Sequence, residues 1–245
     1  MEFKGKTALI TGASVGIGRA AALQFAEKGA AVVVADWNQE TLAAVEQELL
    51  RITPDVLAVR CDVSKQDEVL AAVRAGEERF GKIDILVNNA ALWRAYGSFL
   101  ESSVDEWKQY IDINVMGVVY FSKAVLPGML ERHWGRIINV ASVAGVYPKA
   151  NMVHYSATKA AVIAISSALA KEVTAEGVLV NAVSPGSVSD SGNSDIDHHT
   201  PSDLCFMGRT GTDRENANLI CFLAGEDASY IAGQNILIDG CRMKM

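Results

Sequence analysis

Apolar residues occur in short, nearly unbroken runs that alternate with longer stretches in which polar and apolar positions mix. Seven of these runs are rich in β-branched residues and are bounded by turn-forming residues, as buried strands are. The predicted strands cover residues 7–11, 31–35, 56–63, 83–90, 135–142, 178–186 and 235–240. Strands without polar alternation are typical of a parallel sheet that helices cover on both faces.

Stretches with a helical mixture of apolar and polar positions separate these strands. The predicted helices cover residues 17–28, 39–51, 65–81, 104 to about 132, and 151 to about 176. Gly29 is well placed to end the first helix, because glycine tolerates the left-handed conformation that follows many helices. Alternating strands and helices with right-handed crossovers predict an α/β fold with a doubly wound, mostly parallel, seven-stranded sheet.

No linker rich in proline, glycine or serine divides the chain, so we expect residues 1–245 to form a single domain. Residues 187–203 are too polar for the core, and a loop of this length in a compact domain is usually a lid or a binding loop. We therefore expect a substrate lid at about residues 187–207. Its DIDHH motif, residues 195–199, fits no standard ligand spacing, and we predict no metal.

Charge and cysteine usage narrow the function classes. The formal net charge of −7 leaves no basic footprint for nucleic acid or for an anionic membrane. The N-terminal residues lack the pattern of a signal peptide, and no apolar run is long enough to span a bilayer. Cys61, Cys205, Cys221 and Cys241 form no CxxC pair and indicate reduced thiols, although spacing alone does not exclude a disulfide. We expect a soluble, cytoplasmic protein.

The first predicted strand runs directly into TGASVGIG, which places Gly12, Gly16 and Gly18 at the start of a helix. Glycines allow a tight turn and a close approach of the backbone to a pyrophosphate, while the helix N–H groups and dipole favour the anion. The spacing, G-x-x-x-G-x-G, differs from the general G-x-G-x-x-G pattern. Its position between a strand and a helix nevertheless predicts a dinucleotide site.

Asp36 ends the second predicted strand, where an acid can accept hydrogen bonds from an adenosine ribose. A carboxylate here repels the additional phosphate of NADP, and neither Val15 nor Trp37 offers a cation to that phosphate. The sequence therefore predicts that NAD(H) is preferred over NADP(H). The competing interpretation makes Asp36 the N-cap of the next helix.

In VHYSATKAAV, residues 153–162, Tyr155 and Lys159 lie four positions apart and would share one face of a helix. One interpretation is a buried tyrosine beside a lysine whose ammonium reaches solvent. The other is a proton-transfer pair, because a free phenol has a pKa of about 10 that a neighbouring ammonium lowers. We expect the side chain of His154 to point away from the reacting face.

Several motifs occur together in a fixed order. They are TGASVGIG, NNA at residues 88–90, Asn114, Ser142, YSATK and SPG at residues 184–186. This set resembles the short-chain dehydrogenase/reductase family, whose members of this type consist of one Rossmann-fold domain. The resemblance covers about residues 6–240. It implies that Tyr155 is the general acid/base and that Lys159 lowers its pKa and binds the nicotinamide ribose. It also implies that Ser142 hydrogen-bonds the substrate oxygen and that Asn114 helps to hold a proton-relay water.

The same resemblance implies a set of cofactor contacts. It places the adenine beside Asp62 and Val63, the adenine ribose beside residues 89–90, and the nicotinamide beside residues 185–186. The expected NAD contacts are Gly12, Ser14, Val15, Gly16, Ile17, Gly18, Asp36, Trp37, Asp62, Val63, Asn89, Ala90, Ala91, Tyr155, Lys159, Pro185, Gly186 and Val188.

Three positions depart from the family pattern. Ala91 replaces a common glycine after NNA, Asp190 stands where a threonine often contacts the nicotinamide carboxamide, and Cys241 replaces a glycine near the end. A carboxylate at position 190 adds negative charge near the ring, which favours NAD⁺ over NADH and weakly favours oxidation as the direction.

The family layout also implies the walls of a substrate pocket. Its expected members are Trp93, Ser142, Val143, Tyr147, Met152 and Tyr155, with an outer rim of Arg94, Tyr96, Phe206 and Met207. Ordinary packing explains each aromatic residue equally well. This mixture suits a partly apolar alcohol or ketone.

We predict an NAD-dependent oxidoreductase that interconverts a secondary alcohol and a ketone, with Tyr155 exchanging the hydroxyl proton. One alternative is a reductase of 3-oxoacyl thioesters of acyl carrier protein or CoA. That role usually requires NADPH and a basic surface, which Asp36 and the acidic charge balance disfavour. Another alternative is a noncatalytic NAD(H)-binding regulator. The resemblance further implies a homotetramer, or a dimer, formed through the helices that begin near residues 104 and 151.

Overall fold

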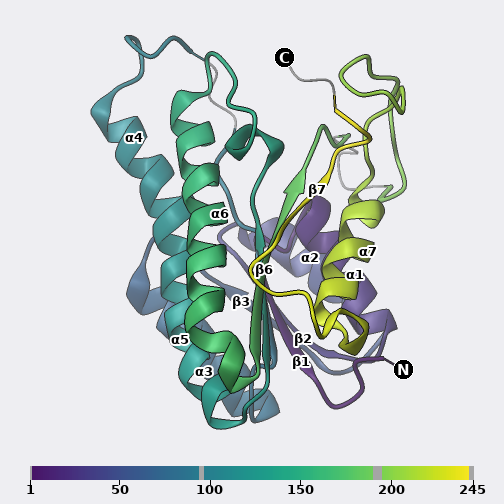
Figure 1. The fold of residues 1–245 in the computed structure, drawn as a ribbon. Helices are drawn as coiled ribbons and strands as arrows, with labels where there is room; N and C mark the ends of the chain where they lie inside the picture. The colour runs from purple at the N-terminus through teal and green to yellow at the C-terminus, as the bar shows by residue number, and fades with distance from the viewer. Residues whose placement is uncertain (1, 94–96, 190–194, 243–245) are drawn as a thin grey trace.

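The computed structural model describes residues 2–93, 97–189 and 195–242 and contains a central sheet between two layers of helices (Figure 1). Seven strands form this sheet in the order β3-β2-β1-β4-β5-β6-β7, and all neighbouring strands are parallel. The strands are β1 (Thr7–Thr11), β2 (Ala31–Asp36), β3 (Val56–Arg60), β4 (Ile85–Asn88), β5 (Gly135–Val140), β6 (Val178–Pro185) and β7 (Asn235–Ile238). The order reverses direction between β1 and β4, which confirms the predicted doubly wound fold.

Two hydrophobic cores lie on opposite faces of the sheet, because successive side chains of each strand point to opposite sides. In β1, Ile10 belongs to the core under α1, α2 and α7, whereas Leu9 belongs to the core under α3, α5 and α6. The helices are α1 (Gly16–Glu27), α2 (Gln39–Leu50), α3 (Gln66–Phe80), α4 (Val104–Ile111), α5 (Gly117–Glu131), α6 (Val153–Val173) and α7 (Asp213–Ala224). Burial of both faces explains why the strands read as continuous apolar runs.

Several strands end earlier than the apolar pattern predicts. β3 ends at Arg60 and β5 at Val140, so Asp62 and Ser142 lie in the loops beyond the sheet. In the predicted helical region from residue 104 to about 132, a π-helical turn, η1 (Asp112–Met116), separates α4 from α5. Because the strands end early, the candidate residues Asp62 and Ser142 lie in loops at the carboxyl ends of the strands.

Helix α7 is an element to which the sequence analysis assigned no structure. Thr212 is its N-cap and forms a capping box, in which Thr212 Oγ1 accepts from Glu215 N and the Glu215 side chain accepts from Thr212 N. The T-x-x-E pattern before an apolar stretch was the available signal. α7 packs extensively on α1, so it completes the layer over the nucleotide-loop side of the sheet.

All four cysteines are free thiols. Cys61, Cys205 and Cys221 are buried and Cys241 is exposed. Burial raises the pKa of the Cys61 thiol to about 12, so this group stays protonated and unreactive at neutral pH.

Within the described ranges one continuous helical segment, Val104–Glu131, is long and apolar enough to cross a membrane by length and composition, so the prediction that no apolar run reaches this length is wrong. In the fold it contacts α3 and α6, and 39% of its most apolar window is buried. Core helices of soluble proteins meet the same criterion of length and apolarity, so these properties alone do not indicate a membrane span.

Candidate active site

The described site candidates gather where the parallel strands end. Asp36 is the last residue of β2 and Pro185 the last of β6, while Asp62, Asn89 and Ser142 follow β3, β4 and β5. Ligands of open α/β sheets bind outside the carboxyl ends of the strands, at the point where the strand order reverses. The topology therefore brings together residues that are far apart in the sequence.

The glycine loop after β1 is shaped by close contacts that exclude side chains. Gly12 and Gly16 have φ angles of +58° and +56°, which favour glycine. A Cβ atom on Gly18 would overlap the carbonyl oxygen of Gly12 and the amide nitrogen of Asn89. Asn89 Nδ2 donates to Gly12 O at 2.9 Å, and Thr11 Oγ1 accepts from Ala90 N at 3.1 Å. The loops after β1 and β4 are thus locked to each other.

The N-terminus of α1 suits an anionic group. Val15 is its N-cap and provides no side-chain acceptor, and no acidic residue lies in the first turn of this described helix. No cap side chain therefore occupies the N–H groups of the first turn. Because α1 begins just after β1 ends, these groups and the positive end of the helix dipole lie at the carboxyl ends of the strands. Together with the glycine cradle, this donor set fits a pyrophosphate.

Asp36 is buried and held by two backbone N–H groups and one hydroxyl group. Its Oδ2 accepts from Ser14 N at 3.1 Å and from Ser14 Oγ at 2.7 Å, and its Oδ1 accepts from Asn38 N at 3.1 Å. Asn38, rather than Asp36, is the N-cap of α2, because its side chain accepts from Glu40 N and Thr41 N. The interpretation of Asp36 as a helix cap is therefore wrong. Trp37, beside it, is 69% exposed.

Lys159 is buried, with 3% of its surface exposed, and Tyr155 is only partly buried. Lys159 Nζ donates to Val140 O at 2.7 Å and lies 5.8 Å from the centroid of the Tyr155 ring. Burial lowers the pKa of Lys159 to about 8, so the side chain is still charged at pH 7. The arrangement of a buried tyrosine beside a solvent-reaching lysine does not occur here.

Ser142 lies at the N-terminus of a short 3₁₀ turn, η2 (Val143–Gly145), where its Oγ accepts from Ala144 N at 3.1 Å. Gly145 ends this turn against the backbone of α6. A Cβ atom on Gly145 would lie 2.7 Å from the carbonyl carbon of Lys159 and 2.8 Å from Ala160 N. Gly145 therefore permits the loop of Ser142 to approach the helix of Tyr155, a role that the sequence analysis missed.

Asn114 is 1% exposed and lies in the π-helical turn η1. Its Oδ1 accepts from Leu92 N at 2.7 Å, and its Nδ2 donates to Leu92 O at 2.9 Å and to Thr158 Oγ1 at 3.1 Å. Thr158 Oγ1 in turn donates to Tyr155 O at 2.9 Å. The network connects Asn114 to the backbone of Tyr155, and π-helical turns are frequent at functional sites.

The expected cofactor residues beyond the glycine loop occupy different environments. Asp62 is half-buried and accepts from Ser64 N at 3.0 Å, while Val63 is buried. Val63 packs on Gly117, whose Cβ would lie 3.0 Å from the Val63 side chain. Val188 forms an isolated bridge with Gly211.

The expected substrate residues differ in how far their side chains are exposed. Val143 and Met152 are buried, and Tyr147 is half-buried. Trp93 is 45% exposed, and Phe206 and Met207 are also exposed. Arg94, Tyr96 and Asp190 lie outside the described residues.

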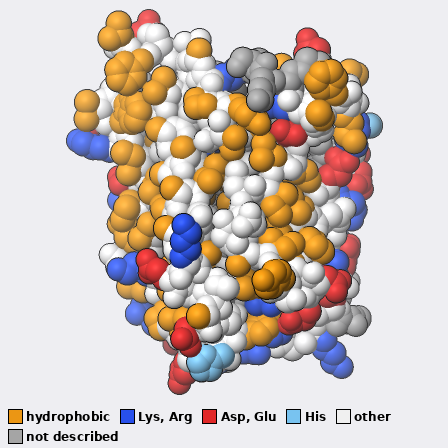
Figure 2. Space-filling view, in the orientation of Figure 1, with side chains coloured by type: hydrophobic (Ala, Val, Ile, Leu, Met, Phe, Trp, Pro, Cys, Tyr) orange, Lys and Arg blue, Asp and Glu red, His pale blue; other side chains and the backbone are white. Residues whose placement is uncertain are grey.

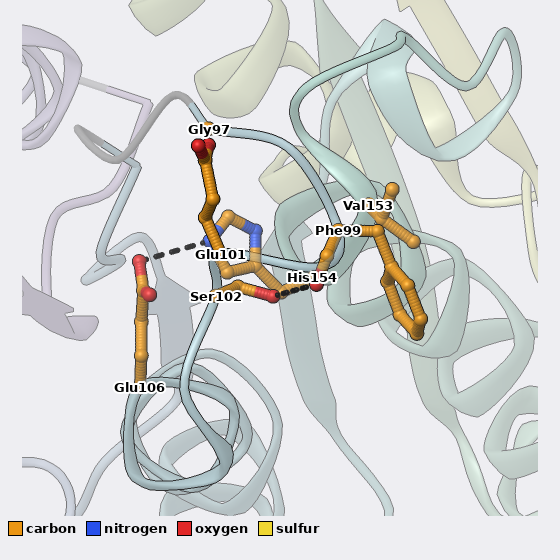
Figure 3. Close-up of a pocket in the computed structure, with 7 residues that line it drawn as sticks. All are labelled: Gly97, Phe99, Glu101, Ser102, Glu106, Val153 and His154. Carbon is orange, nitrogen blue, oxygen red and sulfur yellow. Dashed lines mark hydrogen bonds and ion pairs between the residues drawn. The ribbon is translucent and has the colours of Figure 1, made fainter.

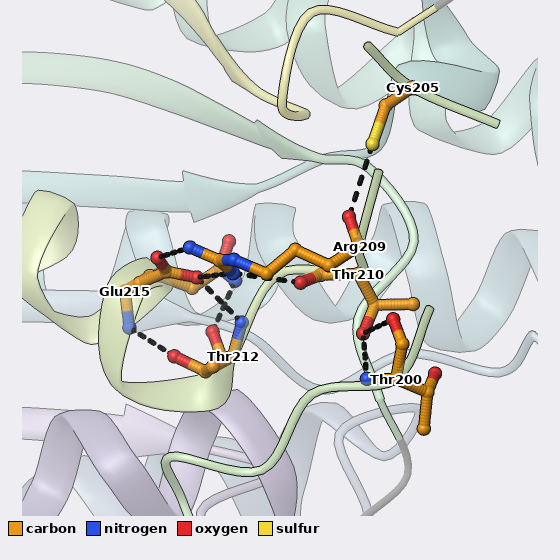
Figure 4. Close-up of polar contacts among 7 residues, drawn as sticks. Thr200, Cys205, Arg209, Thr210, Thr212 and Glu215 are labelled. Atoms are coloured by element: carbon orange, nitrogen blue, oxygen red, sulfur yellow. Dashed lines mark hydrogen bonds and ion pairs between the residues drawn. The ribbon is translucent and has the colours of Figure 1, made fainter. Parts of the chain in front are cut away.

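The expected lid is joined to the start of α7 by polar contacts (Figure 4). Arg209 makes a bidentate ion pair with Glu215 at 2.6 and 3.0 Å, and its carbonyl accepts from Cys205 Sγ. Hydrogen bonding to Arg209 lowers the pKa of the Glu215 carboxyl to about 2. Asp197 pairs with Arg214, and nowhere in residues 2–93, 97–189 and 195–242 do three metal-binding side chains cluster.

The fold and the strand-end cradle define a class of proteins: α/β enzymes of the Rossmann type that bind a dinucleotide beside a buried lysine and a tyrosine. The model of the family described as short chain dehydrogenase matches residues 6–200. The chain belongs to this family and is an oxidoreductase.

Individual relatives cover nearly the whole chain. A 3-oxoacyl-[acyl-carrier-protein] reductase of Thermotoga maritima is 35% identical over 98% of both chains. A meso-2,3-butanediol dehydrogenase of Serratia marcescens is 36% identical over 98% of this chain and 95% of its own. The structure of an NAD⁺-bound xylitol dehydrogenase superposes with a TM-score of 0.91 at 31% identity, covering 98% of this chain and 100% of that one.

The close approach at Gly145 generates a first prediction. Replacing Gly145→Ala forces the loop of Ser142 away from α6, because the new methyl group overlaps the backbone of Lys159 and Ala160. We expect the free energy of unfolding to fall by about 1–3 kcal/mol and turnover to fall at least about 10-fold.

Urea unfolding and steady-state kinetics measure the two effects. Gly97→Ala is the matched control, since a Cβ atom there meets no atom within 4 Å. Unchanged stability and turnover in Gly145→Ala would show that this contact does not position the site.

Proposed function

We propose that the protein is an NAD-dependent oxidoreductase that interconverts a secondary alcohol and a ketone. The observation that carries the proposal is the buried, charged Lys159 beside the partly exposed Tyr155, with Ser142 held on the adjoining loop. A proton donor and acceptor of this kind is what an alcohol/ketone reaction requires, and a protein that only binds a dinucleotide does not need it.

Each side chain has a defined task in this proposal. Tyr155 Oη takes the hydroxyl proton of an alcohol, or returns it to a carbonyl oxygen in reduction. The ammonium of Lys159 favours the phenolate form by its charge. Ser142 Oγ donates a hydrogen bond to the substrate oxygen as its charge changes. The nicotinamide cofactor, when bound, supplies or accepts the hydride.

Asn114 completes the proposed catalytic set. Its side chain holds Leu92 and Thr158 through three hydrogen bonds, so it contributes by fixing the turn around Tyr155. The π-helical turn in which it lies breaks the regular i to i−4 bonding and favours a main-chain acceptor for a relay water.

Three observations support NAD over NADP. Asp36 is a buried acid at the end of β2, where we propose that the adenosine ribose binds. Arg60, its register partner on β3, pairs at 3.5 Å with the carboxylate of Glu68, an acidic neighbour that disfavours an added phosphate. In addition, the similar xylitol dehydrogenase structure is described as NAD⁺-bound.

A 3-oxoacyl-thioester reductase is the second candidate. It is favoured by the relatives, because several of the most similar curated proteins carry the name 3-oxoacyl-[acyl-carrier-protein] reductase at 35–38% identity. Asp36 and the net charge of −7 speak against it, since they disfavour NADPH and an acidic carrier. A noncatalytic NAD(H)-binding regulator is the third candidate.

We further propose one catalytic domain over residues 1–245, a substrate lid at about 187–207, and a homotetramer in the cytoplasm. The apolar window of Val104–Glu131 is only 39% buried within one chain. Hydrophobic side chains run down the side of the molecule on which α4, α5 and α6 lie (Figure 2). Small exposed residues on α6, such as Ala164 and Ala168, allow a second copy to approach closely.

Replacing Tyr155→Phe tests the reaction. We expect kcat/KM for secondary alcohols with NAD⁺ to fall at least about 100-fold, because the proton acceptor is lost, while NADH binding followed by fluorescence is retained. The panel includes 2,3-butanediol, xylitol and a 3-oxoacyl thioester with either reduced cofactor. Tyr230→Phe, at a fully exposed tyrosine, is the control. NADH binding without any turnover by the wild type would favour the regulator.

Replacing Asp36→Asn tests cofactor preference. The change removes the charge and keeps the shape of the side chain, so we expect the NAD⁺/NADP⁺ ratio of kcat/KM to fall at least about 10-fold, or about 1.4 kcal/mol. Asp67→Asn, in the first turn of α3, removes an acid elsewhere and should leave the ratio unchanged within about twofold. A wild type that prefers NADP⁺ would contradict the proposal.

Light scattering tests the assembly. We expect four chain masses for the wild type and a smaller assembly for Ala164→Arg, because the arginine places an unpaired charge in the proposed α6 interface. A monomeric wild type is the outcome that refutes the tetramer.

A further inference from the structure

The first turn of α6 lacks a conventional N-terminal cap. Its N-cap is Met152, whose apolar side chain makes no cap hydrogen bond in the described structure. The first backbone bond of the turn runs from Ser156 N to Met152 O, so the N–H of Tyr155 lies just before the regular ladder. Tyr155 N instead donates to His154 Nδ1 at 2.9 Å. The imidazole next to the proposed acid/base therefore caps its backbone.

A second hydrogen bond fixes the orientation of this imidazole. His154 Nε2 lies 3.1 Å from Glu106 Oε1 on α4, and Figure 3 shows this contact as a dashed line between two side chains that line the same surface hollow. Because Nδ1 accepts from Tyr155 N, Nε2 must carry the ring proton and donate to the carboxylate. The two contacts define the neutral Nε2–H tautomer.

Aromatic packing holds the ring in the same orientation. His154 is 4% exposed, and its ring stacks on Tyr110 with centroids 4.1 Å apart and planes 18° apart. Trp107 packs from another side at 5.9 Å. Glu106, Trp107 and Tyr110 all belong to α4, so one helix determines where the imidazole lies. The side chain is thus directed toward α4.

The backbone carbonyl of Tyr155 is also connected to the segment formed by α4 and η1. Thr158 Oγ1 donates to Tyr155 O, and Asn114 Nδ2 donates to Thr158 Oγ1. Glu106 and Asn114 flank the junction of α4 and η1. Both polar groups of the Tyr155 main chain are therefore tied by side chains to one continuous helix.

We propose that Glu106 and His154 are positioning residues for Tyr155: a carboxylate–imidazole pair that caps the first turn of α6 and fixes the acid/base against α4. The proposal rests on the proposed function of Tyr155. A displacement of a reacting group by about 1 Å costs about 100-fold in rate, so a capped backbone at this residue has a direct catalytic consequence. The pair acts through Tyr155 and does not itself touch the substrate.

Four variants separate the two hydrogen bonds from packing. His154→Phe keeps a ring against Tyr110 and removes both hydrogen bonds. His154→Asn keeps an acceptor near the position of Nδ1 and loses the contact with Glu106. Glu106→Gln retains an acceptor for Nε2–H, whereas Glu106→Ala removes it. Val153→Ala, at an exposed residue lining the same hollow, is the matched control.

Kinetics of the full-length protein provide the first measurement. We expect His154→Phe to lower kcat at least about 10-fold with KM changed less than about threefold, since substrate contacts remain. We expect His154→Asn and Glu106→Gln to retain most of the wild-type kcat. The kcat of Glu106→Ala should lie between those of His154→Phe and Glu106→Gln. NADH affinity should stay within about twofold throughout.

Hydrogen exchange provides a measurement that does not depend on activity. Mass spectrometry of peptides spanning residues 152–160 should show faster exchange at the Tyr155 amide in His154→Phe, and protection restored in His154→Asn. If the wild type turns over no substrate, the proposed function fails while exchange still tests the cap. Wild-type kcat and exchange in His154→Phe, or equal defects in His154→Asn and His154→Phe, would overturn the positioning role.

Discussion

The hydrogen bond from Lys159 Nζ to Val140 O is the interaction on which the geometry of the site depends. It joins α6 to the end of β5, two residues before Ser142, and so relates the two segments that carry the proposed chemistry. The ammonium is stripped of water, and its pKa falls from 10.5 to about 8. Because the folded-state pKa is lowered, this group penalises folding increasingly as pH falls from about 10.5 to about 8, and fully below that. The fold thus retains a charge that burial disfavours.

Close backbone contacts, more than side-chain packing, determine how the strand-end loops meet. Gly18 touches Gly12 and the Asn89 side chain, and Gly145 touches α6 at Lys159. A methyl group on Gly18 would displace the loops after β1 and β4, and one on Gly145 would push the loop after β5 away from α6. The glycines therefore set distances between functional groups that come from separate parts of the sequence.

The seven strands, the order of the motifs and the shared helix of Tyr155 and Lys159 could be predicted, because periodicity and spacing are local properties. The burial of Lys159 could not, since a four-residue spacing fits a solvent-reaching lysine equally well. The role of Gly145 and the π-helical turn at Asn114 also depend on tertiary contacts. Helix α7 was readable from the Thr212–Glu215 capping box.

Helix α4 connects the loop that precedes it to the imidazole of His154. Trp107 Nε1 donates to Ser102 Oγ, and the Trp107 ring meets both Phe99 and His154. The loop before α4 is therefore packed on the same residues that orient the imidazole beside Tyr155. Because the interior is close-packed, a shift of α4 is passed to His154 as a change of position. The position of the Tyr155 backbone therefore depends on the whole of helix α4. Tyr155 and Lys159 themselves supply the groups for the proposed proton transfer.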